Sequence, residues 1–171
     1  MMEVLCLVLD YEKLFSEVIP QAMVDTESTP VNLEGIDVPK KLKTGTLLIA
    51  EDSKTAQKHL RRVFERANLS YKIFDNGQLL MNYVNSLENL DNIPAIITDI
   101  EMPEMSGFTV LQLLKKNPET FNIPVIVNSS MTGENNKREA EVLGADGFVN
   151  KTKSQDIIPL IIELMNKMED R

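Results

Sequence analysis

From residue 46 onward the chain alternates short apolar runs with longer stretches in which apolar residues recur at helical spacing. The short runs are typical of parallel strands that are buried on both faces of a sheet. They predict strands over residues 47–50, 71–74, 95–98, 125–127 and 148–149. Each strand is followed by a predicted helix, the last of which covers residues 157–168. Five strands alternating with five helices predict an α/β fold, with a parallel sheet covered by helices on both faces.

Residues with capping and turn preferences mark the ends of these helices. Ser53 can cap the first helix with its side chain, and Asn68 fits the end of the same helix. Asn76 and the glycine after it open the second helix, while Gly144 suits the position just past the fourth. Pro159 falls in the opening turn of the last helix, where its missing N–H has the least effect.

The first 44 residues follow a different pattern. An apolar run over residues 4–9 and apolar residues at helical spacing before Pro20 predict a strand and a short helix that have no sheet of their own. Residues 25–44 are polar, with prolines, a glycine and three lysines, and are typical of a linker. We therefore expect an extension over 1–24, a linker over 25–44 and a domain over 45–171. The apolar strand is expected to pack on that domain or to pair with a second copy of the chain.

Composition narrows the class of protein. The 171 residues carry a net charge of −8, which argues against nucleic acid or an anionic membrane as the main partner. A single cysteine, Cys6, excludes an internal disulfide framework and fits a reducing compartment. The apolar run over 4–9 is too short to span a bilayer, and no Lys or Arg precedes it as in a signal peptide. A cytoplasmic protein without membrane insertion is expected.

Polar side chains follow the predicted strands at the points where they end. Glu51 and Asp52 come after the first strand and Asp99 after the third, while Ser129 follows the fourth and Lys151 the fifth. In sheets of this kind, ligands bind outside the carboxyl ends of the strands. We therefore expect three carboxylates, a hydroxyl and an ammonium group to meet at one edge of the sheet.

This set of groups suits phosphoryl transfer to a carboxylate. Carboxylates held close together repel one another unless a cation is present, and Mg²⁺ commonly joins one or two carboxylates to a phosphate. A carboxylate nucleophile forms an acyl phosphate in a reaction that depends on positioning and charge neutralisation rather than on a strong base. Lys151 would then neutralise one phosphoryl oxygen and Ser129 would donate a hydrogen bond to another.

Each of these residues also has a simpler interpretation. A single acidic residue at a strand end is usually a turn residue or a helix cap, and a single lysine is usually solvated. Their joint occurrence in this order favours a phosphoryl site instead. No glycine-rich phosphate loop follows the first strand, which argues against a flavin or nucleotide enzyme. His59, the only histidine, is expected at the surface without a role in phosphotransfer.

Four ordered motifs between residues 46 and 168 resemble the response-regulator receiver family. They are Leu-Ile-Ala-Glu51-Asp52-Ser53, Thr98-Asp99-Ile-Glu-Met-Pro-Glu-Met-Ser-Gly107, Val125-Ile-Val-Asn-Ser-Ser130 and Gly144-Ala-Asp-Gly-Phe-Val-Asn-Lys151. The resemblance implies a flavodoxin-like fold with strand order 2-1-3-4-5. It also implies that the protein is a signalling phosphoacceptor rather than an enzyme, apart from self-phosphotransfer and autodephosphorylation.

The same resemblance assigns roles to individual residues. Asp99 would accept the phosphoryl group from a histidine kinase. Asp52, Asp99 and the backbone carbonyl of Glu101 would bind Mg²⁺, with Glu51 acting largely through water. Ser129 would move toward the phosphoryl group, while Phe148 repacks inward as the second part of a switch.

The sequence departs from this family next to Lys151. Thr152 stands where the family usually has a proline after a cis bond. A cis bond before a residue other than proline costs about 3–4 kcal/mol, so a trans bond and a differently shaped loop are expected. Phe148 replaces the common tyrosine, so a switch at this position would depend on packing alone.

Residues 5–15 resemble the closing strand and helix of CheW-like coupling domains. A receiver joined to such a tail suggests the CheV type of chemotaxis coupling protein, of which the chain would carry only the tail of the first domain. The alternative is a native helical extension. No DNA-binding output domain is expected after the last predicted helix, which ends at Met168.

The functional expectation follows from both resemblances. A CheA-type kinase would phosphorylate Asp99, which would modulate the coupling between receptors and kinase or drain phosphate from the kinase. Chemoreceptors would be partners through the CheW-like part, and residues 1–24 would allow a homodimer. The rival hypothesis is a pseudo-receiver, which uses the same fold as a constitutive protein-binding module.

Overall fold

The computed structural model describes residues 38–169. The strand and helix predicted over residues 1–24, and the packing or pairing expected of them, lie outside the described residues. So does the linker predicted over residues 25–44, except for its last seven residues. None of the helices between residues 38 and 169 has the length and apolarity needed to cross a bilayer.

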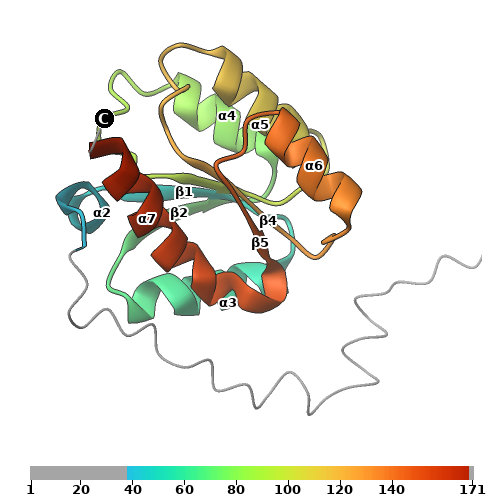
Figure 1. Ribbon diagram of the computed structural model, residues 1–171, viewed down its shortest axis with the longest axis horizontal. Coiled ribbons are helices and arrows are strands. Elements are labelled where there is room, and N and C mark those ends of the chain that lie inside the picture. Colours follow the sequence, from blue (N-terminus) through green and yellow to red (C-terminus); the bar gives the residue numbers. More distant parts are fainter. Residues whose placement is uncertain (1–37, 170–171) are drawn as a thin grey trace, which may run out of the picture. The chain divides into compact units, whose positions relative to one another are not determined.

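Five parallel strands form one sheet in the order β2-β1-β3-β4-β5 (Figure 1), which confirms the predicted order 2-1-3-4-5. The strands are β1 (Thr46–Ala50), β2 (Ser70–Phe74), β3 (Ile96–Thr98), β4 (Val125–Ser129) and β5 (Gly147–Asn150). Ala50 is in register with Thr98, and Thr98 with Val127, so the carboxyl ends of the central strands lie side by side.

Helices cover both faces of the sheet. They are α2 (Lys40–Thr44), α3 (Lys54–Arg66), α4 (Gly77–Asn85), α5 (Gly107–Lys116), α6 (Glu134–Val142), the 3-10 helix η1 (Lys151–Asp156) and α7 (Ile157–Glu169). Helices α4, α5 and α6 lie on one face, and α3 and α7 lie on the other (Figure 1). Buried apolar side chains accordingly form two cores, which we call the α3/α7 core and the α4–α6 core.

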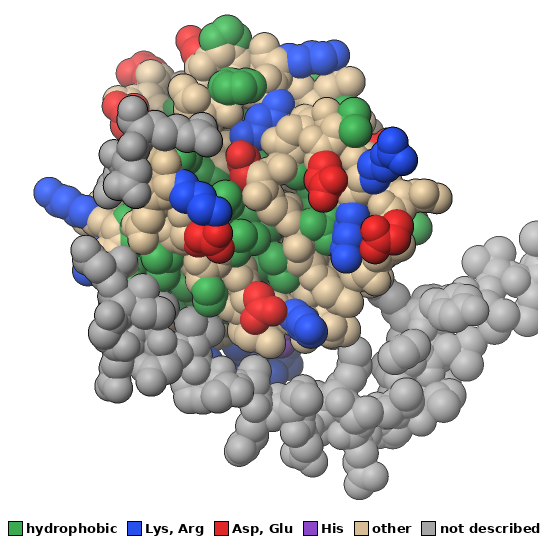
Figure 2. All heavy atoms as spheres, viewed as in Figure 1, with side chains coloured by type: hydrophobic (Ala, Val, Ile, Leu, Met, Phe, Trp, Pro, Cys, Tyr) green, Lys and Arg blue, Asp and Glu red, His purple; other side chains and the backbone are tan. Residues whose placement is uncertain are grey.

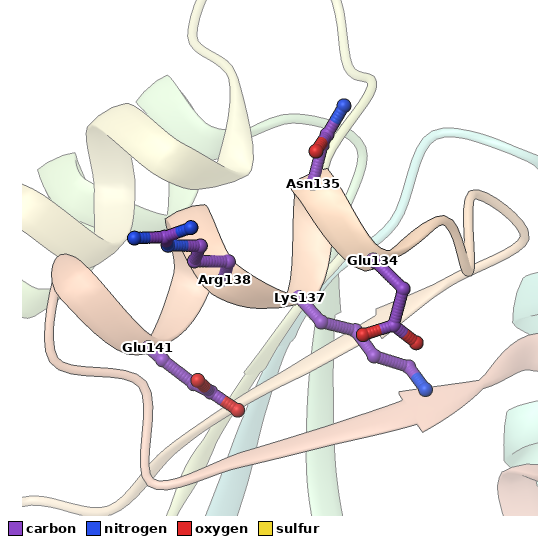
Figure 3. A pocket seen from close by; sticks show the side chains of 5 residues that line it. All are labelled: Glu134, Asn135, Lys137, Arg138 and Glu141. Atoms are coloured by element: carbon purple, nitrogen blue, oxygen red, sulfur yellow. The ribbon is translucent and has the colours of Figure 1, made fainter.

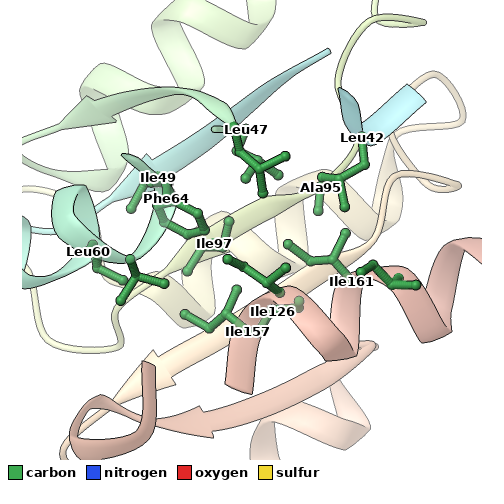
Figure 4. Close-up of a cluster of buried hydrophobic side chains, with 14 of the residues drawn as sticks. Leu42, Leu47, Ile49, Leu60, Phe64, Ala95, Ile97, Ile126, Ile157 and Ile161 are labelled. Atoms are coloured by element: carbon green, nitrogen blue, oxygen red, sulfur yellow. The ribbon is translucent and has the colours of Figure 1, made fainter. Parts of the chain in front are cut away.

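The two cores explain why the strands are apolar on both sides. In β1, Leu47 and Ile49 belong to the α3/α7 core (Figure 4), whereas Leu48 and Ala50 belong to the α4–α6 core. Successive side chains of a strand point to opposite faces, so an unbroken apolar run is needed when both faces are covered.

The predicted caps are present. The Ser53 hydroxyl accepts a hydrogen bond from the Ala56 N–H at 3.4 Å, and Asn76 Oδ1 accepts one from the Leu79 N–H at 2.8 Å. Asn68 and Gly144 follow the ends of α3 and α6 with φ values of 53° and 92°, in the left-handed region. These local signals position the helices without reference to the rest of the fold.

The packed domain begins earlier than the pattern indicates. Leu42 of α2 is 1% exposed and lies in the α3/α7 core (Figure 4), although the prediction assigns this residue to the linker. The helix has only five residues, three of which are lysines, so its one core residue leaves no periodic signal. The described domain therefore includes residues 38–44, ahead of the predicted boundary at residue 45.

Candidate phosphoryl and magnesium site

Three carboxylates meet at the carboxyl edge of the sheet. Glu51 and Asp52 follow β1, and Asp99 follows the neighbouring strand β3. One oxygen from each lies within 4.8 Å of the other two. Glu51 and Asp99 are buried, while Asp52 is exposed. The set consists of oxygen donors and is open to solvent on one side, which fits a hard divalent cation such as Mg²⁺.

Lys151 joins the two buried carboxylates. Its Nζ lies 2.9 Å from Glu51 Oε1 and 3.0 Å from Asp99 Oδ2, although these partners are 100 and 52 residues away in sequence. The ammonium group is therefore shared between two carboxylates. This places a positive charge directly beside the predicted phosphoacceptor.

Burial and charge shift the protonation of all three groups. Burial raises the pKa of Glu51 to about 7, although Lys151 opposes the change. Burial also raises the pKa of Asp99, again against the lowering effect of Lys151. Burial alone would lower the pKa of Lys151, but its contacts with both carboxylates outweigh this and raise it. Additional positive charge among the carboxylates would favour their ionised forms.

The backbone around Asp99 fixes the orientation of its carboxylate. Asp99 Oδ1 accepts a hydrogen bond from the Ile100 N–H at 2.7 Å, which leaves Oδ2 toward Lys151. Helix α5 begins against this loop, because the Gly107 N–H donates to the Ile100 carbonyl oxygen at 2.9 Å. A Cβ atom on Gly107 would lie 1.8 Å from the carbonyl oxygen of Asp99, so only glycine fits there.

Gln57 is a site residue that the sequence reasoning missed. Its Nε2 donates to the Glu51 carbonyl at 2.6 Å and to Asp75 Oδ1 at 2.7 Å, and the side chain is buried. It thereby ties the loop that carries Glu51 and Asp52 to the loop after β2. Gln57 lies on the same buried stripe of α3 as Leu60 and Phe64. A polar residue at such a position needs a hydrogen-bond partner, and this could have indicated its role from the sequence.

Ser129 and Phe148 occupy the positions expected from the pattern. Ser129 is buried at the end of β4 and lies in register with Asn150, the residue before Lys151. Its hydroxyl accepts a hydrogen bond from the Met131 N–H at 3.1 Å. Phe148 is half-buried in β5 and packs against the α4–α6 core.

Glu101 does not join the carboxylate cluster. It lies in the loop between β3 and α5 with its side chain exposed. The cluster consists of Glu51, Asp52 and Asp99. Only the backbone carbonyl of Glu101 was predicted to be a ligand, so its exposed side chain leaves that prediction open.

The segment after Lys151 has the trans geometry expected from Thr152, since no peptide bond in residues 38–169 is cis. It continues as the 3-10 helix η1, which the pattern does not indicate. The Asn150 side chain caps this helix, with Oδ1 accepting from the Thr152 N–H at 2.9 Å.

A second surface feature is a depression on α6. It is lined by the charged and amide side chains Glu134, Asn135, Lys137, Arg138 and Glu141 (Figure 3). Acidic and basic side chains are also interspersed over the face of the molecule shown in Figure 2. The depression lies on a solvated helix face and contains none of the three clustered carboxylates.

Comparison with known proteins agrees with this geometry. The family model of the response regulator receiver domain matches residues 47–163. Chemotaxis proteins CheV2 and CheV1 of Helicobacter pylori are 39% and 35% identical over 150 and 151 residues, which is 88% of this chain and 46% of each relative. The sensor histidine kinase CheAY of the same organism is 26% identical over 72% of this chain and 15% of its own length. The chain thus spans about half the length of the CheV relatives.

Solved structures show the same fold. The receiver domain of a Syntrophus aciditrophicus signal transduction histidine kinase superposes with a TM-score of 0.63 at 27% identity, over 72% of this chain and 91% of that one. The chemotaxis response regulator CheY4 of Vibrio cholerae gives 0.60 at 18% identity, over 69% and 98% of the two chains. Given the match over residues 47–163, the five-stranded sheet and the acidic cluster at its carboxyl edge, this chain belongs to the response regulator receiver domain family.

Proposed function

We propose that the chain is a phosphorylatable module of chemotaxis signalling, in which Asp99 accepts a phosphoryl group from a CheA-type histidine kinase with the help of Mg²⁺. The observation that carries this proposal is the convergence of three carboxylates and Lys151 at one edge of the sheet. The similarity to chemotaxis proteins supports the choice of kinase. A cytoplasmic location belongs to the same proposal.

The carboxylates would hold the metal ion. Asp52, Asp99 and the Glu101 carbonyl are the proposed direct ligands, with Glu51 acting through water. When bound, Mg²⁺ supplies positive charge that offsets the repulsion among the carboxylates and the charge on the phosphoryl oxygens. The raised pKa values of Glu51 and Asp99 support a site that needs such charge to keep its carboxylates ionised.

The transfer step requires only nucleophilic attack and charge stabilisation. A carboxylate oxygen of Asp99 attacks phosphorus, and a new O–P bond forms. The P–N bond to the histidine of the donor breaks, and its electrons leave with the imidazole. Lys151, already 3.0 Å from Asp99 Oδ2, would then contact a phosphoryl oxygen, and Ser129 would donate to another.

The proposed consequence is a change on the α4–α6 side of the sheet. Ser129 would move toward the phosphoryl group, and Phe148 would pack more deeply into the α4–α6 core that it already contacts. This change would modulate the coupling of receptors to the kinase or leave the module as a phosphate sink. Chemoreceptor contact through residues 1–24 is part of the proposal.

The test is phosphoryl uptake from acetyl phosphate and from a phosphorylated CheA kinase, measured by phosphate-affinity electrophoresis with and without Mg²⁺. We expect uptake by the parent protein only with Mg²⁺, and none by Asp99→Asn, because the amide nitrogen and oxygen are poor nucleophiles. Asp91→Asn, an exposed change in the loop before β3, is the matched control and should behave like the parent.

Absence of uptake from both donors, by folded protein with Mg²⁺ in excess, would contradict the proposal. It would favour the pseudo-receiver hypothesis, a constitutive protein-binding module on the same fold. Uptake that persists in Asp99→Asn would instead show that another side chain is the acceptor.

A further inference from the structure

The segment after Lys151 is held by side chains rather than by a proline. Ser154, in η1, is 1% exposed, and its hydroxyl donates to the Lys151 carbonyl oxygen at 2.8 Å. With the Asn150 cap at the other end, this bond fixes the backbone on both sides of the Lys151 side chain. The orientation of the ammonium group toward Glu51 and Asp99 therefore depends on η1.

Asn128 holds Ser154 from the sheet. Its side chain is 1% exposed, and Oδ1 lies 3.4 Å from Ser154 Oγ, while Nδ2 has no hydrogen-bond partner among residues 38–169. Ser154 has one hydroxyl proton, and the shorter bond assigns it to the Lys151 carbonyl. If the Asn128 amide is turned by about 180°, its nitrogen can donate a hydrogen bond to Ser154 Oγ, which has no second proton to give. This orientation also provides the buried NH₂ group with a hydrogen-bond partner.

This pair connects the two residues that would contact the phosphoryl group. Asn128 directly precedes Ser129 in β4, and alternation along the strand places their side chains on opposite faces of the sheet. Ser154 links the α3/α7 side of β4 to the Lys151 backbone. A single chain of hydrogen bonds thus runs from the residue before Ser129 to Lys151.

We propose that Ser154 and Asn128 are positioning residues that hold the Lys151 ammonium group at the phosphoacceptor. The inference rests on the proposed function, since it assigns a role in phosphoryl transfer. Within residues 38–169, neither Ser154 nor Asn128 forms a hydrogen bond with the carboxylates of the candidate metal site, Glu51, Asp52 and Asp99. Their loss should therefore slow transfer while leaving the metal site intact.

The first measurement is the rate of Mg²⁺-dependent phosphorylation by acetyl phosphate, together with Mg²⁺ affinity. We expect Ser154→Ala to lower the maximal rate about 10-fold and to change the Mg²⁺ dissociation constant by less than about 2-fold. The matched control is Ser86→Ala, because the Ser86 hydroxyl makes the same bond to a carbonyl three residues back, to Tyr83 at 2.7 Å, away from the site. The control should keep the parent's rate.

Two further variants separate positioning from stability. Ser154→Thr keeps the hydroxyl and should restore the parent's rate. Asn128→Asp keeps the shape but removes the donor, and it should be as slow as Ser154→Ala. Melting temperatures measured on all variants show whether any rate loss follows loss of folded protein instead.

A second readout does not depend on phosphorylation. In the parent, spectra of lysine labelled with ¹⁵N at Nζ should show slow hydrogen exchange of the Lys151 ammonium, because two carboxylates hold it. Faster exchange is expected in Ser154→Ala and Asn128→Asp but not in Ser86→Ala. Unchanged exchange and rate in both site variants would overturn the positioning role. If the parent protein takes up no phosphoryl group but the variants still differ from it in the hydrogen exchange of Lys151, the result would contradict the proposed function and not the positioning role.

Discussion

At the scale of single residues, the charges at the sheet edge depend on one another. Glu51 and Asp99 are almost fully buried, and both have raised pKa values because burial disfavours their charged forms. Lys151 contacts both and is the one cation paired with them in the described part of the chain. Removing one member of a buried ion pair leaves an uncompensated charge, which is more costly than the pair is worth. The two buried carboxylates therefore depend on Lys151 for the compensation of their charge.

A prediction at this scale concerns His59, on α3. Burial, together with the charges of Arg62 and Arg66, lowers its pKa below the ordinary value of 6.5. The side chain is half-buried rather than at the surface as expected, and its Nε2 is buried with no hydrogen-bond partner in the described part of the chain. The unfolded chain therefore binds a proton more readily than the native protein does. The stability contributed by neutral His59 is complete above pH 6.5 and is lost as the pH falls toward the lowered pKa.

Urea unfolding of the parent and of His59→Gln at about pH 8 and about pH 5.5 tests this. The parent should lose more unfolding free energy on acidification than the variant, because glutamine does not titrate. Carboxylates titrate in both proteins, so the difference between the two isolates His59. An equal loss in both would show that this histidine is protonated as easily in the native state as in the unfolded chain.

At the scale of elements, the loops at the carboxyl edge are held by close backbone contacts. The start of α5 lies against the loop after β3, where the Gly107 N–H donates to the Ile100 carbonyl at 2.9 Å. Lys115 fixes the other end of α5 by donating to the carbonyls of Phe121 and Ile123 and to Asp146. The helix is therefore anchored at both ends, and its contact with Ile100 helps to position the loop that carries Asp99.

Gly107→Ala tests this anchoring. Alanine favours a helix over glycine by up to about 1 kcal/mol, but a Cβ here would lie 1.8 Å from the Asp99 carbonyl oxygen. We expect the steric effect to dominate, with a loss of about 3 kcal/mol in unfolding free energy. Gly133→Ala, at the start of α6, should cost less than about 1 kcal/mol, because apart from the adjacent residues no atom of residues 38–169 lies within 4 Å of the added Cβ. Similar urea midpoints for the two variants would contradict this account.

At the scale of the whole domain, one sheet separates two cores, and each core needs its own cover of helices. The α3/α7 core extends beyond the alternating strands and helices to Val38 and Leu42. Helix α2 therefore contributes a side chain to this core rather than serving only as a connector. We therefore expect the stability of the domain to depend in part on residues that carry no strong secondary-structure signal.

Leu42→Ala measures that dependence. Truncating a leucine that is 1% exposed should cost about 2–5 kcal/mol, a large part of the stability of a domain of this size. Met168→Ala, in the last turn of α7 and 45% exposed, is the control and should change stability by less than about 0.5 kcal/mol. A cost for Leu42→Ala no greater than that of the control would place α2 outside the cooperative unit.

Much of the architecture is readable from local pattern. The apolar runs, the caps at Ser53 and Asn76 and the turn at Gly144 act over a few residues, so they predict the strands and helices directly. The edge where Glu51, Asp52, Asp99 and Lys151 meet also follows, because parallel strands bring their carboxyl ends together. The roles assigned to Ser129, Phe148 and the Glu101 carbonyl remain predictions.

Other features depend on tertiary packing and could not be predicted from local sequence. These features are the burial of Leu42, the bridge made by Gln57 and the contacts of Ser154 with Lys151 and Asn128. Each of them involves a residue in a short or polar segment. Their partners are distant in sequence, or their segments are too short to show a period, so no local preference indicates them. Lys151 illustrates the difference: strand order brings it to the acidic edge, but which carboxylates it contacts depends on side-chain burial and on the loop that holds it.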